Sequence, residues 1–119
     1  TKQVKEMINS NDRLHRHVKA KKTAYLRKLG KYQALNQKGK HFSKDRPCTV
    51  EVIIFSPTKR RLDPPNFYPT IKAIIDGFTD GNLWPDDNYE IIKAMTFRYG
   101  GLSGIKSKYR IEIEIEELV

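Results

Sequence analysis

The last stretch of the chain has the most regular alternation of apolar and polar positions. One arginine and three glutamates alternate there with four apolar residues, Tyr109, Ile111, Ile113 and Ile115. A period of two residues is the spacing of side chains on one face of a β-strand. The pattern therefore predicts a strand over residues 109–116 that is buried on one face only, with its glutamates in solvent.

Two earlier stretches also predict strands. Residues 49–55 are rich in β-branched residues and nearly continuous in apolar character, which is typical of a central strand, and Pro57 ends them. Residues 89–99 predict another strand, one face of which is formed by Ile91, Met95, Phe97 and Tyr99. Residues 3–8 alternate weakly and are interpreted as a short strand or an extended lead-in. A flexible turn is expected at Gly100, Gly101, Ser103 and Gly104.

A helical period marks two segments. The clearer one has apolar residues at i, i+3, i+4 and i+7, namely Ile71, Ile74, Ile75 and Phe78. Pro69 suits its first turn and Gly81 suits the position just past its last turn. In this helix Lys72 and Asp76 lie one turn apart on the polar flank. Residues 23–35 predict a second helix, amphipathic and basic on its polar side.

The order of these elements indicates the fold class. A helix, a strand, a helix and two strands follow one another, with an optional short strand before them. In a chain of 119 residues this order predicts one small α/β domain, in which helices pack on a mostly antiparallel mixed sheet. Residues 1–47 would form a basic arm and helix, and residues 48–119 the core.

The charge is distributed unevenly. The net charge is +9, and residues 1–47 hold 14 Lys and Arg against three acidic residues, so the remaining 72 residues are slightly acidic. A basic arm of this kind suits a polyphosphate partner, because each neutralised phosphate releases condensed counterions. A merely solvated basic surface is the alternative.

The single cysteine and the hydropathy suggest the compartment. Cys48 cannot form an internal disulfide, adjoins an apolar run and is expected to be buried in the core. No apolar run is long enough to span a bilayer, and no signal-peptide pattern is present. These features predict a cytoplasmic protein without a membrane partner.

The segment from Arg60 to Asn88 concentrates the candidate chemistry. Asp63 lies in the loop that enters the helix carrying Lys72 and Asp76. The loop that leaves this helix carries an acidic pair, Asp86 and Asp87. A helix packed by its apolar stripe could bring the two loops together. Crowded carboxylates need a cation to neutralise them, and a cluster of oxygen ligands favours Mg²⁺ or Mn²⁺ over zinc.

Each part of this segment also has a simpler interpretation. Asp63 before two prolines, and the acidic pair after Trp84-Pro85, could be turn formers. Lys72 and Asp76 could be a surface contact of small energetic consequence. Trp84 and Phe67 are expected to be hydrophobic plugs that fix loops, rather than stacking platforms.

The ordered set of motifs resembles the RusA family of Holliday junction resolvases, which are small dimeric Mg²⁺-dependent endonucleases of bacteria, phages and prophages. The family core is Arg-x-Asp-x-Asp-Asn, then a Lys and an Asp on a helix, then a Gly and an Asp-Asp pair. The matching residues are Arg61, Asp63, Asn66, Lys72, Asp76, Gly81, Asp86 and Asp87. Residues 11–17 are similar to an Asn-Arg-aromatic-His stretch that precedes the first helix in the family. The resemblance spans most of the domain.

The resemblance implies an endodeoxyribonuclease that resolves four-way junctions in DNA recombination and repair. Asp63, Asp86 and Asp87 would bind one or two Mg²⁺ ions, Lys72 would stabilise charge on the phosphate, and Asp76 would orient Lys72 or join the outer metal shell. A symmetric homodimer would nick matched strands of the junction. Contacts to DNA are expected from Asn11, Arg13, His15, Arg16, Lys19, Arg60, Arg61 and Asn66.

The chain departs from the family pattern at one place. Pro64 and Pro65 fill the gap between Asp63 and Asn66, so the family's second aspartate has no counterpart. Asn66 also stands six residues before Lys72, where the family asparagine stands three before. Either the loop is rebuilt and the carboxylates still meet, with Asp76 or Asn66 completing the shell, or the chain is a related protein with weakened or altered cleavage. The alternative function is that of a non-catalytic DNA-binding protein that kept the fold and lost cleavage.

Overall fold

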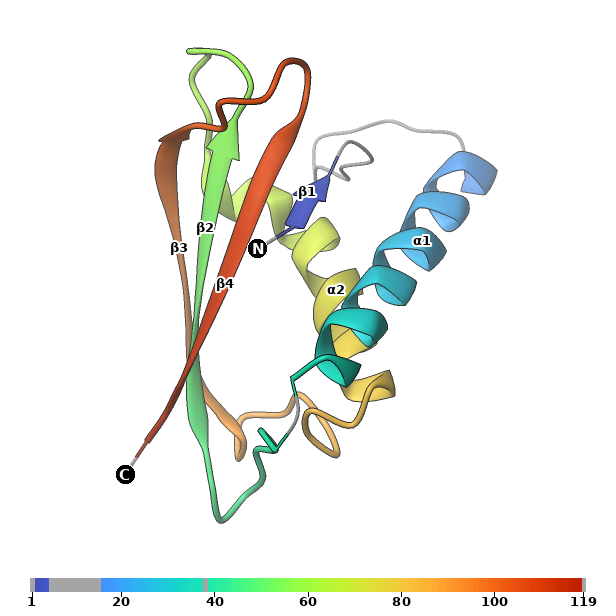
Figure 1. The fold of residues 1–119 in the computed structure, drawn as a ribbon, viewed down its shortest axis with the longest axis vertical. Coiled ribbons are helices and arrows are strands. Elements are labelled where there is room, and N and C mark those ends of the chain that lie inside the picture. Colours follow the sequence, from blue (N-terminus) through green and yellow to red (C-terminus); the bar gives the residue numbers. More distant parts are fainter. Residues whose placement is uncertain (1, 5–15, 38, 119) are drawn as a thin grey trace.

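A four-stranded sheet forms one layer of the protein (Figure 1). The computed structural model describes residues 2–4, 16–37 and 39–118. In the order in which they lie across the sheet, the strands are β1 (Lys2–Val4), β4 (Tyr109–Glu117), β2 (Cys48–Ser56) and β3 (Ile92–Leu102). The pairs β1–β4 and β4–β2 are antiparallel, whereas β2–β3 is parallel. The predicted α/β fold with a mostly antiparallel mixed sheet is confirmed.

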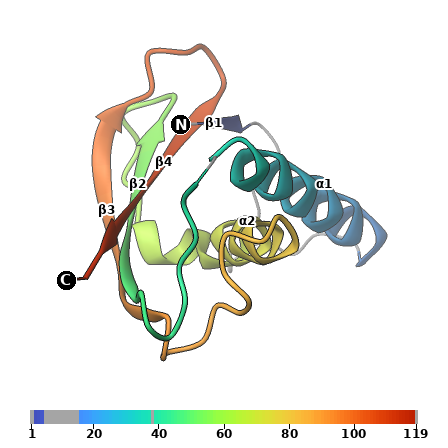
Figure 2. The same ribbon diagram turned by 60° about the horizontal axis from the view of Figure 1, so that its bottom comes forward.

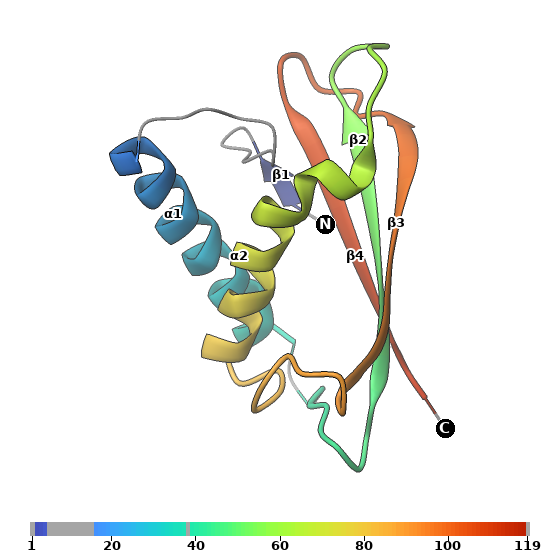
Figure 3. The same ribbon diagram turned by 180° about the vertical axis from the view of Figure 1, so that it is seen from behind.

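Two helices form the second layer. Helix α1 (Arg16–Leu35) and helix α2 (Tyr68–Asp80) lie on the same side of the sheet (Figures 1 and 3). A short 3₁₀ helix, η1 (Pro64–Phe67), leads into α2. In the rotated view of Figure 2, α2 lies against the sheet, and α1 packs on α2 farther from the sheet. The other face of the sheet carries no helix among the described residues.

Several element boundaries differ from those predicted. Helix α1 begins at Arg16 instead of Thr23, because lysine and arginine favour helix where no apolar period marks it. Strand β3 begins at Ile92 rather than Tyr89, since the Ile91 and Ile92 amides both donate to the Asn88 carbonyl in a turn. It also runs through the glycine pair 100–101, which was expected to be a turn. A register shift there absorbs one extra residue.

The core lies between the sheet and α2. It joins Val50, Val52 and Ile54 of β2 to Ile71 and Ile75 of α2. On β4, the alternating isoleucines pack toward this core, and Glu114 and Glu116 are exposed as predicted. No helix in the described part of the chain is long and apolar enough to cross a membrane.

Cys48 is fully buried in this core, as predicted. Burial raises the pKa of its thiol to about 11, because the thiolate would lose its hydration. We therefore expect the folded protein to resist a thiol reagent such as dithionitrobenzoate at pH 8, and to react stoichiometrically once unfolded in guanidinium. Rapid modification of the folded protein would contradict this burial.

The two helices cross at a pair of glycines. Gly30 of α1 and Gly77 of α2 let the backbones touch, because a Cβ at Gly77 would overlap the Arg27 carbonyl oxygen and a Cβ at Gly30 would overlap that of Ile74. Backbone contact of this kind leaves no room for any side chain at either position. The crossing holds the polar flank of α2 beside the basic helix α1.

Candidate functional site

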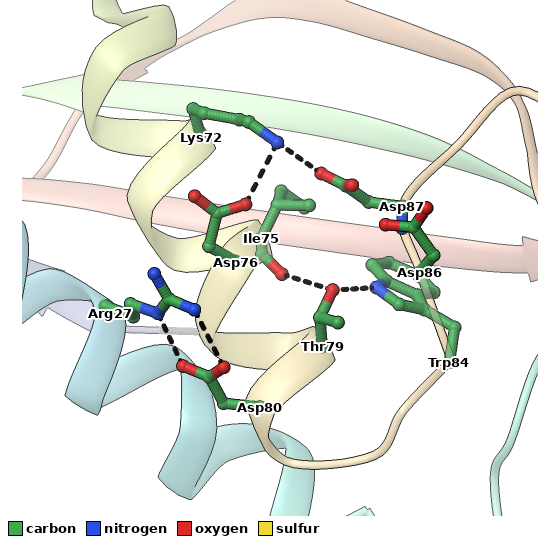
Figure 4. A network of polar contacts seen from close by, with 9 residues as sticks. All are labelled: Arg27, Lys72, Ile75, Asp76, Thr79, Asp80, Trp84, Asp86 and Asp87. Atoms are coloured by element: carbon green, nitrogen blue, oxygen red, sulfur yellow. Dashed lines mark hydrogen bonds and ion pairs between the residues drawn. The ribbon is translucent and has the colours of Figure 1, made fainter.

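Lys72 is the centre of a polar cluster on α2 (Figure 4). Its Nζ lies 2.5 Å from Oδ2 of Asp87 and 2.9 Å from Oδ1 of Asp76. Asp76 comes from the next turn of the same helix, as the sequence predicted, whereas Asp87 comes from the loop after the helix. One ammonium group therefore joins two carboxylates from separate segments.

Trp84 explains how the loop reaches the helix. Its side chain is 1% exposed, it contacts Phe78 edge-on, and its indole Nε1 donates to Oγ1 of Thr79 at 2.9 Å. Asn82 adopts a left-handed backbone conformation (φ 64°), which asparagine tolerates. Leu83 donates its amide to the Phe78 carbonyl. The loop is thus folded back along α2, and the predicted plug role of Trp84 is confirmed.

Asp86 organises the turn that presents Asp87. One of its carboxylate oxygens accepts the Asp87 backbone amide at 2.9 Å, and the other accepts from Nδ2 of Asn88 at 3.2 Å. The Asn88 side chain in turn accepts the amide of Glu90. Asp86 is exposed and forms no ion pair within the described residues. It therefore acts as a turn former and still offers carboxylate lone pairs to solvent.

The charges in this cluster stabilise one another. The hydrogen bond from Lys72 to Asp87 raises the pKa of the lysine ammonium, with Asp76 adding to the effect against a smaller cost of burial. Burial alone would raise the pKa of the Asp87 carboxyl, but the hydrogen bond and charge of Lys72 outweigh it, and the pKa is lowered. Lys72 and Asp87 are therefore both ionised across the physiological pH range.

These shifts predict how stability depends on pH. Asp87 has a lowered pKa in the folded state, so its contribution is present above the unfolded value of about 4 and is lost as the pH falls through the folded value. Because the Lys72 side chain is 43% exposed, the contribution should be about 1 kcal/mol at most. Urea unfolding at pH 7 and pH 3 measures this contribution. The difference in unfolding free energy between wild type and Lys72→Met should be smaller at pH 3 than at pH 7. An equal difference at both pH values would contradict the pairing.

Asp63, the third carboxylate of the predicted metal site, is not grouped with the Lys72 cluster. Asp63 is exposed at the start of η1, and its side chain makes no capping hydrogen bond. Arg60 and Arg61 are exposed in the loop just before it. Across the described residues, no three His, Cys, Asp or Glu side chains are grouped so that they could hold a metal ion. The structure therefore joins Asp76, Asp87 and Lys72 but does not bring Asp63 into a group with the acidic pair.

The remaining predicted DNA contacts divide into two groups. Asn11, Arg13 and His15 lie outside the described residues. Arg16 begins α1, and Lys19 is exposed one turn later, followed along the helix by the exposed Lys21, Lys28 and Lys31. Asn66 is half-buried in η1. Within the predicted basic arm, α1 thus carries exposed lysines along its length.

Sequence reasoning missed one ion pair beside the site. Arg27 of α1 donates from Nε (2.6 Å) and Nη2 (2.9 Å) to the two carboxylate oxygens of Asp80 on α2. The hydrogen bond raises the pKa of Arg27 and lowers that of Asp80. Asp80 is one turn beyond Asp76 on the same flank, and this spacing was the available signal. The pair ties the basic helix to the acidic flank of α2 (Figure 4).

Comparison of the sequence with protein-family models and with curated proteins found no match.

Proposed function

We propose that this protein is a Mg²⁺-dependent endonuclease that cuts branched DNA, in the manner of the RusA family. The observation that carries the proposal is the cluster in which Asp76 and Asp87, from separate segments, meet at Lys72, with Asp86 beside Asp87. A lysine beside paired carboxylates is a suitable arrangement for phosphodiester hydrolysis with a divalent ion.

The donor set at the acidic pair fits Mg²⁺, or Mn²⁺ in its place. Magnesium is commonly bound by one or two carboxylates, with waters and substrate phosphates completing its shell. Asp86 and Asp87 are adjacent and would hold it, and Asp63 would join only if its loop moved toward them. When bound, such an ion lowers the pKa of a coordinated water and polarises the phosphate.

Lys72 has two roles in this proposal. In the structure its ammonium pairs with both Asp87 and Asp76, and it reduces the repulsion between these two carboxylates from separate segments. With DNA bound, the same ammonium would donate to phosphate oxygens and stabilise the charge that develops on them. Asp76, one turn away, would keep Lys72 in position while Asp87 turns to its ligand.

The surface next to the cluster supports DNA as the substrate class. Exposed lysines along α1 suit the phosphate backbone of DNA, and Arg27–Asp80 holds this helix against α2. Arg60 and Arg61 are exposed in the loop before η1 and would contact a second backbone. A symmetric homodimer would place two such sites on one four-way junction. The setting would be cytoplasmic DNA recombination and repair.

The direct test uses labelled four-way junctions, flaps and linear duplex, each incubated with the protein in Mg²⁺, Mn²⁺ or EDTA. We expect cleavage of the branched substrates with either metal, no cleavage in EDTA, and little cleavage of the linear duplex. Tight binding of junctions without a cut under any divalent ion would overturn the nuclease proposal.

A non-catalytic DNA-binding protein with this fold is the second candidate. The observation that favours it is the position of Asp63, which leaves the described residues without a group of three carboxylates. Such a protein would bind junctions equally well with metal or EDTA. Its affinity would fall steeply with salt, because binding would depend on phosphate contacts alone.

A further inference from the structure

Three aromatic rings lie together where helix α2 begins beside β3. Tyr68, the first residue of α2, contacts Phe97 of β3 edge-on, with 6.3 Å between the ring centroids. Tyr99 lies two residues further along β3, on the same face of the strand. Tyr68 and Tyr99 are 47% and 42% exposed, whereas Phe97 packs against the core. Both exposed rings therefore adjoin Phe97, one from the helix and one along the strand.

Both exposed rings are held in place. The Ser56 hydroxyl donates its one hydrogen to the Thr58 carbonyl at 2.6 Å, so the Tyr99 hydroxyl, 2.8 Å away, donates to Ser56. This bond ties Tyr99 to the loop that follows β2. Tyr68 is fixed by its contact with Phe97. Side chains that are already held lose little freedom when a ligand binds, and this favours affinity.

A basic loop adjoins these rings. Lys59, Arg60 and Arg61 are exposed in it, and none of them pairs with a carboxylate among the residues that the structure describes. The loop leaves β2 at the end of the sheet where β3 also ends and where α2 begins (Figure 3). Adjacent cations beside exposed rings match the two features of a single strand of nucleic acid, which are its phosphates and its base faces.

The rings are also next to the Lys72 cluster. Tyr68 and Lys72 are four residues apart on α2, so they occupy the same flank, one turn or about 5.4 Å apart along the helix axis. Asp76 follows one turn further and pairs with Lys72 at 2.9 Å. Along this flank a ligand would meet an aromatic ring, then an ammonium group, then carboxylates. A base on Tyr68 would therefore bring a neighbouring phosphate close to Lys72.

An exposed ring distinguishes unpaired bases from paired ones. Within a duplex, both faces of a base are covered by its neighbours, so a tyrosine can stack only on a base at an end, at a branch point or in a single strand. Every base has an aromatic face, so such stacking tolerates any sequence. A protein partner could also cover exposed tyrosines, but the three adjacent cations favour a polyanion.

We propose that Tyr68 and Tyr99 stack on unpaired bases of branched DNA. The three cations of the neighbouring loop bind the phosphates of the same strand. The DNA ligand is that of the proposed function, on which this assignment rests. A base held on Tyr68 sets the next phosphate beside Lys72. Selectivity for branched over linear DNA then comes from the rings, whereas the cations supply affinity for any DNA.

The test measures binding in EDTA, so that it does not depend on cleavage. Fluorescence anisotropy compares a labelled single strand of about 12 nucleotides that contains 2-aminopurine with a linear duplex of the same sequence. Tyr68→Leu keeps an apolar contact with Phe97 but removes the flat face. It should bind the single strand roughly tenfold more weakly than wild type does, and the duplex equally well. Stacking quenches 2-aminopurine, so its fluorescence should fall when wild type binds and fall less with the variant.

Three variants serve as controls. Tryptophan offers a larger flat face, so Tyr68→Trp should retain binding of the single strand. Tyr25 is exposed to a similar degree, 46%, but lies on α1, so Tyr25→Leu should bind both ligands as wild type does. Arg60→Gln combined with Arg61→Gln should weaken the binding of both ligands and reduce its dependence on salt.

Four results would refute the stacking site. They are absence of quenching with wild type, equal affinity of wild type and Tyr68→Leu for the single strand, equal losses for single strand and duplex, and a change in the sedimentation of the free protein. In the last case the rings would contact a second copy of the chain. The nuclease proposal fails separately: selective loss of single-strand binding in Tyr68→Leu, with no cleavage of junctions by wild type in Mg²⁺, would support the stacking site and refute the nuclease.

Discussion

Replacing Asp87 with asparagine is expected to reduce Mg²⁺-dependent cleavage of a four-way junction by roughly a hundredfold to a thousandfold. Asparagine keeps the shape of the side chain but removes the charge that would hold the ion and that now pairs with Lys72 at 2.5 Å. The measurement is the single-turnover cleavage rate of a labelled junction at saturating protein. Junction binding in EDTA should be unchanged or slightly tighter, because one negative charge near the DNA is lost.

The matched control is Asp45→Asn, which makes the same chemical change at an exposed position before β2. It should leave both cleavage and binding at the wild-type level. A second comparison is Asp63→Asn. A large loss of cleavage there would mean that this carboxylate moves to the acidic pair when DNA and metal bind. Wild-type cleavage by Asp87→Asn would remove the Lys72 cluster from the proposed mechanism.

The Gly77→Ala substitution is expected to lower the free energy of unfolding by about 3 kcal/mol or more. A methyl group at Gly77 would overlap the Arg27 carbonyl oxygen and lie too close to the backbone of Gly30 and Lys31. Rigid backbone, unlike the end of a flexible side chain, cannot yield locally, so α1 would have to move away from α2. Urea unfolding monitored by circular dichroism gives the value.

Gly104→Ala is the control for this substitution. Gly104 has a positive φ (75°), and an added Cβ meets nothing within 4 Å, so only the cost of the left-handed backbone applies, about 1 kcal/mol. A Gly77→Ala protein as stable as Gly104→Ala would contradict the close crossing. The crossing also positions Arg27 for Asp80, so a surviving Gly77→Ala protein should bind DNA through a displaced basic helix and cleave it more slowly.

The sequence determined the elements with a strong local period. Alternation fixed the last strand because one face of it must be buried, and the i, i+3, i+4, i+7 stripe fixed α2 because the stripe packs on the sheet. The burial of Cys48 followed from the apolar run that it adjoins, and that of Trp84 from the usual role of a large aromatic side chain as a plug that fixes a loop. The start of α1 and both ends of β3 were missed, since backbone turns and intrinsic helix propensity carry no apolar period.

Within the candidate site, the sequence determined the Lys72–Asp76 pair, because both residues lie on one helix and their spacing fixes their separation. It also placed Asp86 and Asp87 together in the loop that follows. Only the tertiary structure decided that Asp87 reaches Lys72 and that Asp63 stays apart. These outcomes depend on the paths of two loops, one anchored by the buried Trp84 and the other containing Pro64 and Pro65. No local sequence pattern predicts the path of a loop.

Tertiary packing also decided the relations between elements that are distant in the chain. A helix between β2 and β3 permits a parallel pair, but the choice of β4 as the other neighbour of β2 depends on which faces fit around one core. The Arg27–Asp80 pair is a consequence of that arrangement. Periodicity specifies which face of each element is buried, and the partner of that face is set by the shape of the whole core.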